Sequence, residues 1–183
     1  MKKRITCNDV LDEIMSRWKS MGKWREIESN VVQNDLDILF ADIMKFGMMS
    51  LKKKEMVPFG ITMDIHTSVT AGALPREWFP EGDDVVNFLA TSIKEHRTEY
   101  KAISIMWEAT LIREGGKKVV VVLLEHSIGK ILVEAVIPYE RKGRFFKKKV
   151  LLDFDSIRFT EREKIIWDGT PDAVSKQSRR IDG

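Results

Sequence analysis

The fold of this chain is decided by four runs rich in β-branched and aromatic residues: AISIMWEATLI (residues 102–112), KVVVVLLEH (118–126), ILVEAVIPY (131–139) and FFKKKVLLDF (145–154). Short glycine-bearing segments connect them, at residues 115–116, 127–130 and 141–144. Apolar runs joined by such connections are typical of β-hairpins. The sequence therefore predicts a four-stranded antiparallel meander.

The chain before the meander shows mostly helical periodicity. Apolar residues recur at helical spacing in three segments: 10–21, 34–47 and 86–93. Alternation with a period of two predicts one strand at residues 59–66. After Thr160 we expect a short helical turn. The predicted class is therefore α+β, with N-terminal helices, one strand, a helix, and then a four-stranded antiparallel β-meander packed against the helices.

The bulk composition favours one globular domain. The chain has 183 residues, of which 43% are hydrophobic and 32% charged, and its net charge is +3. We expect a single domain over residues 1–167 and a mobile polar tail over residues 168–183. The only cysteine is Cys7, and no apolar run is long enough to span a membrane. These features predict a soluble cytoplasmic protein without a cofactor.

The register of the meander follows if every hairpin loop has an even number of residues. This assumption gives four pairs of opposite residues: Trp107 and Leu124, Glu108 and Leu123, Leu123 and Glu134, and Ile137 and Lys148. One face then holds Trp107 and most other large apolar residues, and we expect it to be the core. The opposite face mixes apolar with charged residues: Val119, Val121, Leu123, Leu132 and Val136, with Glu108, Glu125 and Glu134. Because that face is semi-apolar, we expect a helix or a second subunit to cover part of it.

Three glutamates converge on this second face in the predicted register. Glu108 and Glu134 flank Leu123 at about 10 Å from each other, two strand spacings apart, and Glu125 lies one row away. Carboxylates gathered on a partly buried surface can do acid–base work or bind a hard cation. Ordinary outward-facing residues paired with lysines explain the same pattern, and we favour that simpler interpretation. His66 is a further weak candidate for metal or proton transfer, whereas His126 is expected to bond to backbone near a turn.

Two basic segments raise the question of nucleic acid. The first is Lys52, Lys53 and Lys54, and the second contains Arg141, Lys142 and Arg144. Together they could form a phosphate-attracting stripe. Strand alternation splits such charges between faces, and lysine on a last strand also blocks edge-to-edge aggregation. We therefore favour edge protection over nucleic-acid binding.

The sequence ranks three functions without deciding whether the chain is an enzyme. The first is a binding or assembly domain that forms a homodimer through the semi-apolar sheet face. The second is a small enzyme or metal-dependent activity at Glu108, Glu125 and Glu134, with or without His66. The third is a nucleic-acid-binding accessory protein that uses the basic segments. No P-loop, dinucleotide fingerprint or zinc-protease motif is present in the sequence.

Overall fold

The computed structural model describes residues 7–51, 56–73, 84–142 and 149–169. Its helices are α1 (Cys7–Met21), α2 (Trp24–Ile27), α3 (Asn30–Leu51) and α4 (Asp84–Glu95). Its strands are β1 (Phe59–Asp64), β2 (Val69–Ala73), β3 (Tyr100–Leu111), β4 (Lys117–His126), β5 (Leu132–Lys142), β6 (Lys149–Leu152) and β7 (Arg158–Arg162). Short 3-10 turns occupy Arg97–Glu99, Ile112–Glu114 and Phe154–Ser156. The predicted α+β class is confirmed.

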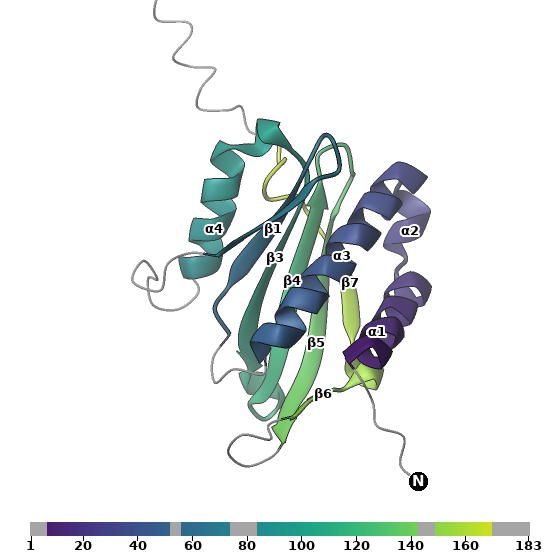
Figure 1. Ribbon diagram of the computed structural model, residues 1–183, viewed down its shortest axis with the longest axis vertical. Helices are drawn as coiled ribbons and strands as arrows, with labels where there is room; N and C mark the ends of the chain where they lie inside the picture. The colour runs from purple at the N-terminus through teal and green to yellow at the C-terminus, as the bar shows by residue number, and fades with distance from the viewer. Residues whose placement is uncertain (1–6, 52–55, 74–83, 143–148, 170–183) are drawn as a thin grey trace, which may run out of the picture.

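The strands form one antiparallel sheet with helices on both sides. The order is β2-β1-β3-β4-β5-β6, and β7 also pairs with β5. Helix α3 runs across one face, here called the inner face, with α1 and α2 beside it (Figure 1). Helix α4 contacts β3 on the opposite, outer face. The sheet is therefore the middle of three layers.

The inner core is built around aromatic side chains from helices and from β7. Trp18 of α1 stacks on Phe40 of α3 with ring centroids 4.3 Å apart, and Phe159 of β7 lies 5.4 Å from Trp18. Trp24 of α2 lies 4.7 Å from Trp18. These contacts join the helices to the far edge of the sheet, because aromatic groups bury large areas and prefer such offset packing.

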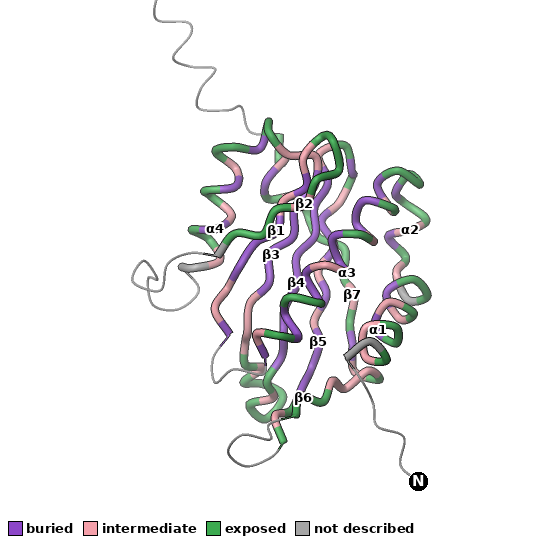
Figure 2. The backbone as a smooth tube through the Cα atoms, in the orientation of Figure 1, coloured by how far each residue is buried: buried purple, intermediate pink, exposed green. Residues whose placement is uncertain are grey.

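A smaller apolar cluster lies on the outer face. Leu89 and Ile93 of α4 pack against Ile103 and Ile105 of β3, and Ile166 from the C-terminal segment joins them. Strand β4, between β3 and β5, is buried at every position from Val119 to His126. Figure 2 shows this burial running along the central strands. Both faces of the sheet therefore contribute to the core.

The register predicted between β3 and β4 is wrong by three residues. Leu111 pairs with Lys117, so Trp107 lies opposite Val121 and Glu108 opposite Val120. The reason is the turn: residues 112–114 form a 3-10 turn, and Gly115 and Gly116 both have positive φ, at 72° and 77°. An odd shift exchanges the faces of β3 relative to β4. Trp107 is therefore not in the inner core but half-buried on the outer face, beside the α4 cluster.

The other two hairpins keep the predicted faces. Leu123 pairs with Glu134 as predicted. Tyr139 pairs with Leu152, which differs from the predicted register by six residues. Because that shift is even, it does not exchange the faces. The apolar sets assigned to the core on β4 and β5 accordingly line the inner face: Val120, Val122, Leu124, Val133, Ala135 and Ile137.

Some elements differ from the sequence-based expectation. Strand β2, which the sequence periodicity did not predict, pairs with β1 across a tight turn. Strand β7 pairs with β5, and the chain after it, at residues 163–169, has no helical turn. The expected tail lies outside the described residues except for Asp168 and Gly169.

The β3–β4 register can be tested with paired cysteines in a Cys7→Ser background. Thr110 and Lys118 are directly opposite and exposed, and opposite Cβ atoms lie about 4.5–5.5 Å apart, close to disulfide geometry. Thr110→Cys with Lys118→Cys is expected to crosslink on mild oxidation, as measured by loss of free thiol. The control is Thr110→Cys with Val121→Cys, which a two-residue loop would bring together. A crosslink in the control and none in the first pair would contradict the observed register.

Candidate functional site

Glu108 lies on the inner face near the end of β3. Its Oε2 accepts a hydrogen bond from Arg141 Nη2 at 2.8 Å, and its Oε1 lies 3.5 Å from Lys118 Nζ. Arg141 Nε in turn donates to the carbonyl oxygen of Leu51 at 3.0 Å. The carboxylate therefore holds the arginine that ties β5 to the last residue of α3.

Tyr139 is the titratable neighbour of this pair. Burial raises the pKa of its hydroxyl, and the negative charge of Glu108 acts in the same direction, while Arg141 opposes it. The Arg141 guanidinium carbon lies 5.3 Å from the centroid of the Tyr139 ring. The tyrosine hydroxyl is buried and has no hydrogen-bond partner within the described ranges. It therefore stays protonated near neutral pH, which does not suit a general base.

Glu125 is fully buried on the outer face of β4. Its two carboxylate oxygens accept hydrogen bonds from the backbone amides of Ile165, Ile166 and Trp167 at distances of 2.8–3.3 Å. A carboxylate held by several backbone amides is strongly bound, because hydrogen bonds to a charged group are roughly twice as strong as neutral ones. Glu125 therefore anchors the C-terminal segment against the sheet.

Glu134 lies on the outer face of β5, opposite Thr160 of β7. Its Oε1 accepts a hydrogen bond from Arg162 Nη2 at 2.9 Å, and its side chain is 20% exposed. The three glutamates therefore do not converge as predicted. Glu108 faces the opposite side of the sheet because of the β3–β4 register, so the expected pairing of Glu108 with Glu134 across Leu123 is wrong.

His66 lies in the exposed turn between β1 and β2. Asp64 shapes that turn, since its Oδ1 accepts hydrogen bonds from the amides of His66 and Ser68 at 2.8 and 2.9 Å. These bonds, led by the one from Ser68, lower the pKa of Asp64. Among the residues that the structure describes, no group of three or more histidine, cysteine or acidic side chains could hold a metal ion.

The basic candidates are only partly described. Lys52, Lys53, Lys54 and Arg144 lie outside the described residues. Arg141 is engaged by Glu108, and Lys142 forms an exposed ion pair with Glu140 at 3.0 Å. The two described members of the predicted stripe thus have acidic partners.

Sequence reasoning missed a buried charge network near the beginning of α3. His126 Nε2 lies 3.1 Å from Asp35 Oδ2, and Lys101 Nζ lies 3.0 and 2.9 Å from the two Asp35 oxygens. Because the Ile128 amide donates to His126 Nδ1 at 3.2 Å, Nε2 carries the proton that bonds to Asp35. The predicted backbone bond of His126 is confirmed. The available signal was Asp35 itself, a charge within the apolar stripe of its helix.

The β4–β5 turn, residues 127–130, accepts and donates hydrogen bonds with two charged side chains that lie far apart in the sequence. Glu28 Oε1, beside α2, accepts hydrogen bonds from the amides of Lys130 and Ile131 at 2.6 and 3.0 Å. Lys164 Nζ donates to the carbonyl oxygens of Ser127 and Gly129 at 2.9 and 3.0 Å. Burial lowers the pKa of Lys164, although Glu125 and Glu28 oppose that shift. The charged side chains at this end of the sheet therefore hold the turn and the neighbouring segments in place.

The opposite end of the outer face carries an open groove of about 520 Å³. Its lining comes from residues 110–114, from β5 and from β7: Thr110, Leu111, Ile112, Arg113, Glu114, Glu134, Val136, Arg158, Thr160 and Arg162. Arg158 pairs with Glu114 at 2.9 Å, so one ion pair joins the hairpin to β7. Ile112 is 86% exposed at the groove.

The apolar row predicted on the outer face is mostly covered within the chain. Val119, Val121, Leu123 and Leu132 are all buried, and only Val136 is half-buried. The cover on this side includes α4 and the C-terminal segment, whereas the N-terminal helices lie on the inner face. The groove lies at the end of this face where Val136 stays half-buried.

No protein-family model, curated protein or solved structure matches this chain. In the described ranges, none of the helices combines the length and the apolar character needed to cross a bilayer.

The anchoring role of Glu125 predicts a large stability loss in Glu125→Ala. Three backbone amides would lose a charged acceptor, and bonds to charged groups contribute about 1.5–3 kcal/mol each. We expect a loss of at least about 3 kcal/mol in urea unfolding. The control is Glu161→Ala, which removes an exposed carboxylate from β7. Equal stability of the two variants would contradict the anchoring role.

Proposed function

We propose that this chain is a cytoplasmic binding and assembly domain that pairs with a second copy of itself through the outer-face groove. The observation that carries the proposal is the 86% exposure of Ile112 beside the groove. Leu111 and Val136 also line the groove, so Ile112 belongs to an apolar part of its surface that a partner can cover. Most of the apolar row on that face is covered within the chain, and half-buried Val136 is the member of the row that lines the groove.

The charges around the groove support a second copy as the occupant. A two-fold interface uses the same patch on both partners, so the patch must complement itself. This groove carries both signs, with Arg113, Arg158 and Arg162 beside Glu114 and Glu134. A rotated copy could place arginines of one chain opposite glutamates of the other. A stable interface needs about 800 Å² from each partner, so the hairpin tip and β7 would both contribute.

The other two functions have less support from the geometry. Glu125 is enclosed by backbone amides and Glu108 is paired with Arg141, so neither presents a free carboxylate to a substrate. The catalytic roles of Glu108, Glu125, Glu134 and His66 stay predictions, as does nucleic-acid binding.

The proposal predicts a concentration-dependent dimer that Ile112→Asp disrupts. The exposed side chain allows this change without disturbing the fold, while the carboxylate removes the apolar contact assigned to Ile112 and must lose water when the interface forms. Sedimentation velocity over a range of micromolar concentrations is the measurement. We expect the unmodified chain to approach a dimer and Ile112→Asp to stay monomeric.

Ile128→Asp is the matched control. Ile128 is also highly exposed, at 70%, but lies on the β4–β5 turn, at the other end of the sheet. This variant should dimerise like the unmodified chain. Monomers at all concentrations, or equal dimerisation of both variants, would refute the proposed interface.

A further inference from the structure

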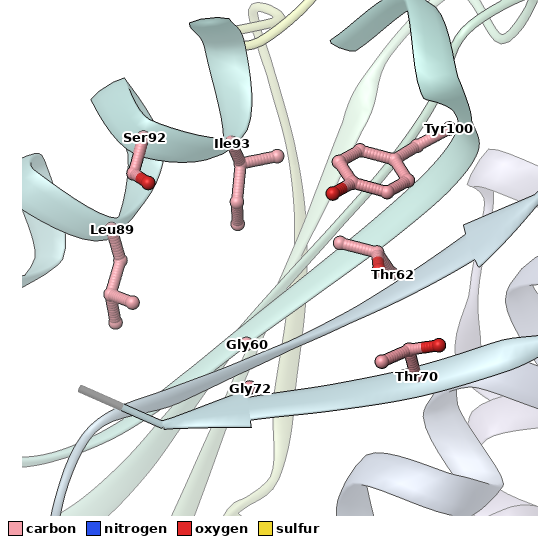
Figure 3. A pocket seen from close by; sticks show the side chains of 8 residues that line it. All are labelled: Gly60, Thr62, Thr70, Gly72, Leu89, Ser92, Ile93 and Tyr100. Atoms are coloured by element: carbon pink, nitrogen blue, oxygen red, sulfur yellow. The ribbon is translucent and has the colours of Figure 1, made fainter. Parts of the chain in front are cut away.

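A second hollow of the outer face lies between α4 and the β1–β2 hairpin. It encloses about 240 Å³ and is lined by Gly60, Thr62, Thr70, Gly72, Leu89, Ser92, Ile93 and Tyr100 (Figure 3). Strands β1 and β2 form its floor, α4 supplies one wall, and Tyr100 reaches in from the start of β3. This cleft shares none of its lining residues with the groove described above.

The cleft exists because its floor has almost no side chains. Gly60 is directly opposite Gly72, and in the next row on this face Thr62 is opposite Thr70. A Cβ on Gly60 would lie 3.3 Å from Ile93 Cδ1, so packing of α4 accounts for that glycine. A Cβ on Gly72 would meet no atom within 4 Å. Since glycine weakens a strand and often marks a place where another group approaches closely, packing within the described chain leaves Gly72 unexplained.

The side chains that line the cleft define the chemistry of a ligand. Thr62, Thr70, Ser92 and Tyr100 contribute hydroxyl groups, and within the described part of the chain these groups make no side-chain hydrogen bond. Leu89 and Ile93 add an apolar wall. A hydroxyl group can donate and accept, so it suits neutral partners with both capacities.

The lining excludes strongly charged ligands. None of the eight residues is acidic, basic or a histidine. An ionised group placed here would lose water without gaining a counter-charge, which is costly. The volume equals about eight water molecules at about 30 Å³ each, the size of one substituted six-membered ring.

We propose that this cleft binds one small, uncharged ring compound that carries hydroxyl groups, the chemistry of a monosaccharide. The apolar C–H face of such a ring packs against Leu89 and Ile93. Its hydroxyl groups exchange hydrogen bonds with Ser92, Tyr100 and the two threonines. The glycine floor lets the ring approach the strand backbone.

The test is an amide NMR titration of the full chain with glucose, galactose and myo-inositol. We expect saturable shifts in the millimolar range at the amides of Gly60, Gly72 and Ser92 with at least one of them. Glucuronate and glucosamine, which carry one charge on a similar ring, should shift these amides at least tenfold more weakly. Absence of saturable shifts with all three neutral rings would overturn the proposal, as would equally tight binding of the charged rings.

The variant Gly72→Val tests whether the ligand binds in this cleft or elsewhere on the surface. The added side chain occupies the floor, and its Cβ meets no atom within 4 Å. We expect it to abolish the saturable shifts, and its dispersed amide spectrum checks the fold. Ala71→Val, on the same strand but facing the other side, is the control and should bind normally.

Ser92→Ala gives an independent variant on α4. Loss of one neutral hydrogen bond should weaken binding by about two- to tenfold. Unchanged affinity in both Gly72→Val and Ser92→Ala would overturn the assignment of the ligand to this cleft.

Discussion

The rest of the structure depends on a central strand that is apolar on both faces. Residues Val119–Leu124 contain no polar side chain, so alternation sends apolar groups to both sides of the sheet. Both sides must then be covered, because each buried apolar group contributes roughly 25 cal/mol per Å² removed from water. Helix α3 and its neighbours cover the inner side, and α4 and the C-terminal segment cover part of the outer side. The three-layer arrangement follows from this one strand.

The layers on the two faces of the sheet are held in place by buried charged side chains at one end of the sheet. Asp35 binds His126 and Lys101 on the inner side, while Glu125 holds the C-terminal segment on the outer side. Glu28, early in the chain, and Lys164, late in it, both form hydrogen bonds with backbone groups of the turn between β4 and β5. Leaving any such group buried without a partner would be expensive, so their pairing is a condition of the fold. Of the three glutamates that the sequence predicted to converge, Glu125 thus has a structural role.

Periodicity was sufficient to predict the fold class and the faces of β4 and β5, but not the face of β3. Strand β3 is apolar on both sides, with Met106 inward and Ile105 outward, so its pattern fits either orientation. The turn determines which face of β3 points inward. Gly115 and Gly116 have positive φ after a 3-10 turn, and the loop between Leu111 and Lys117 therefore has an odd number of residues. Glu108 changed faces with its strand, so the three glutamates do not lie together on one face. The partners of Glu125 were unpredictable because they are backbone amides some forty residues away.

Double coverage of β4 is the central claim, and the solvent accessibility of its methyl groups tests it most directly. A soluble paramagnetic probe attenuates exposed methyl signals in a sample with labelled valine, leucine and isoleucine methyl groups. The structure predicts strong protection for both the inner set, Val120, Val122 and Leu124, and the outer set, Val119, Val121 and Leu123, with exposed Ile128 as the attenuated reference. Strong attenuation of the outer set alone would contradict the account, because the outer face of β4 would then be open to solvent.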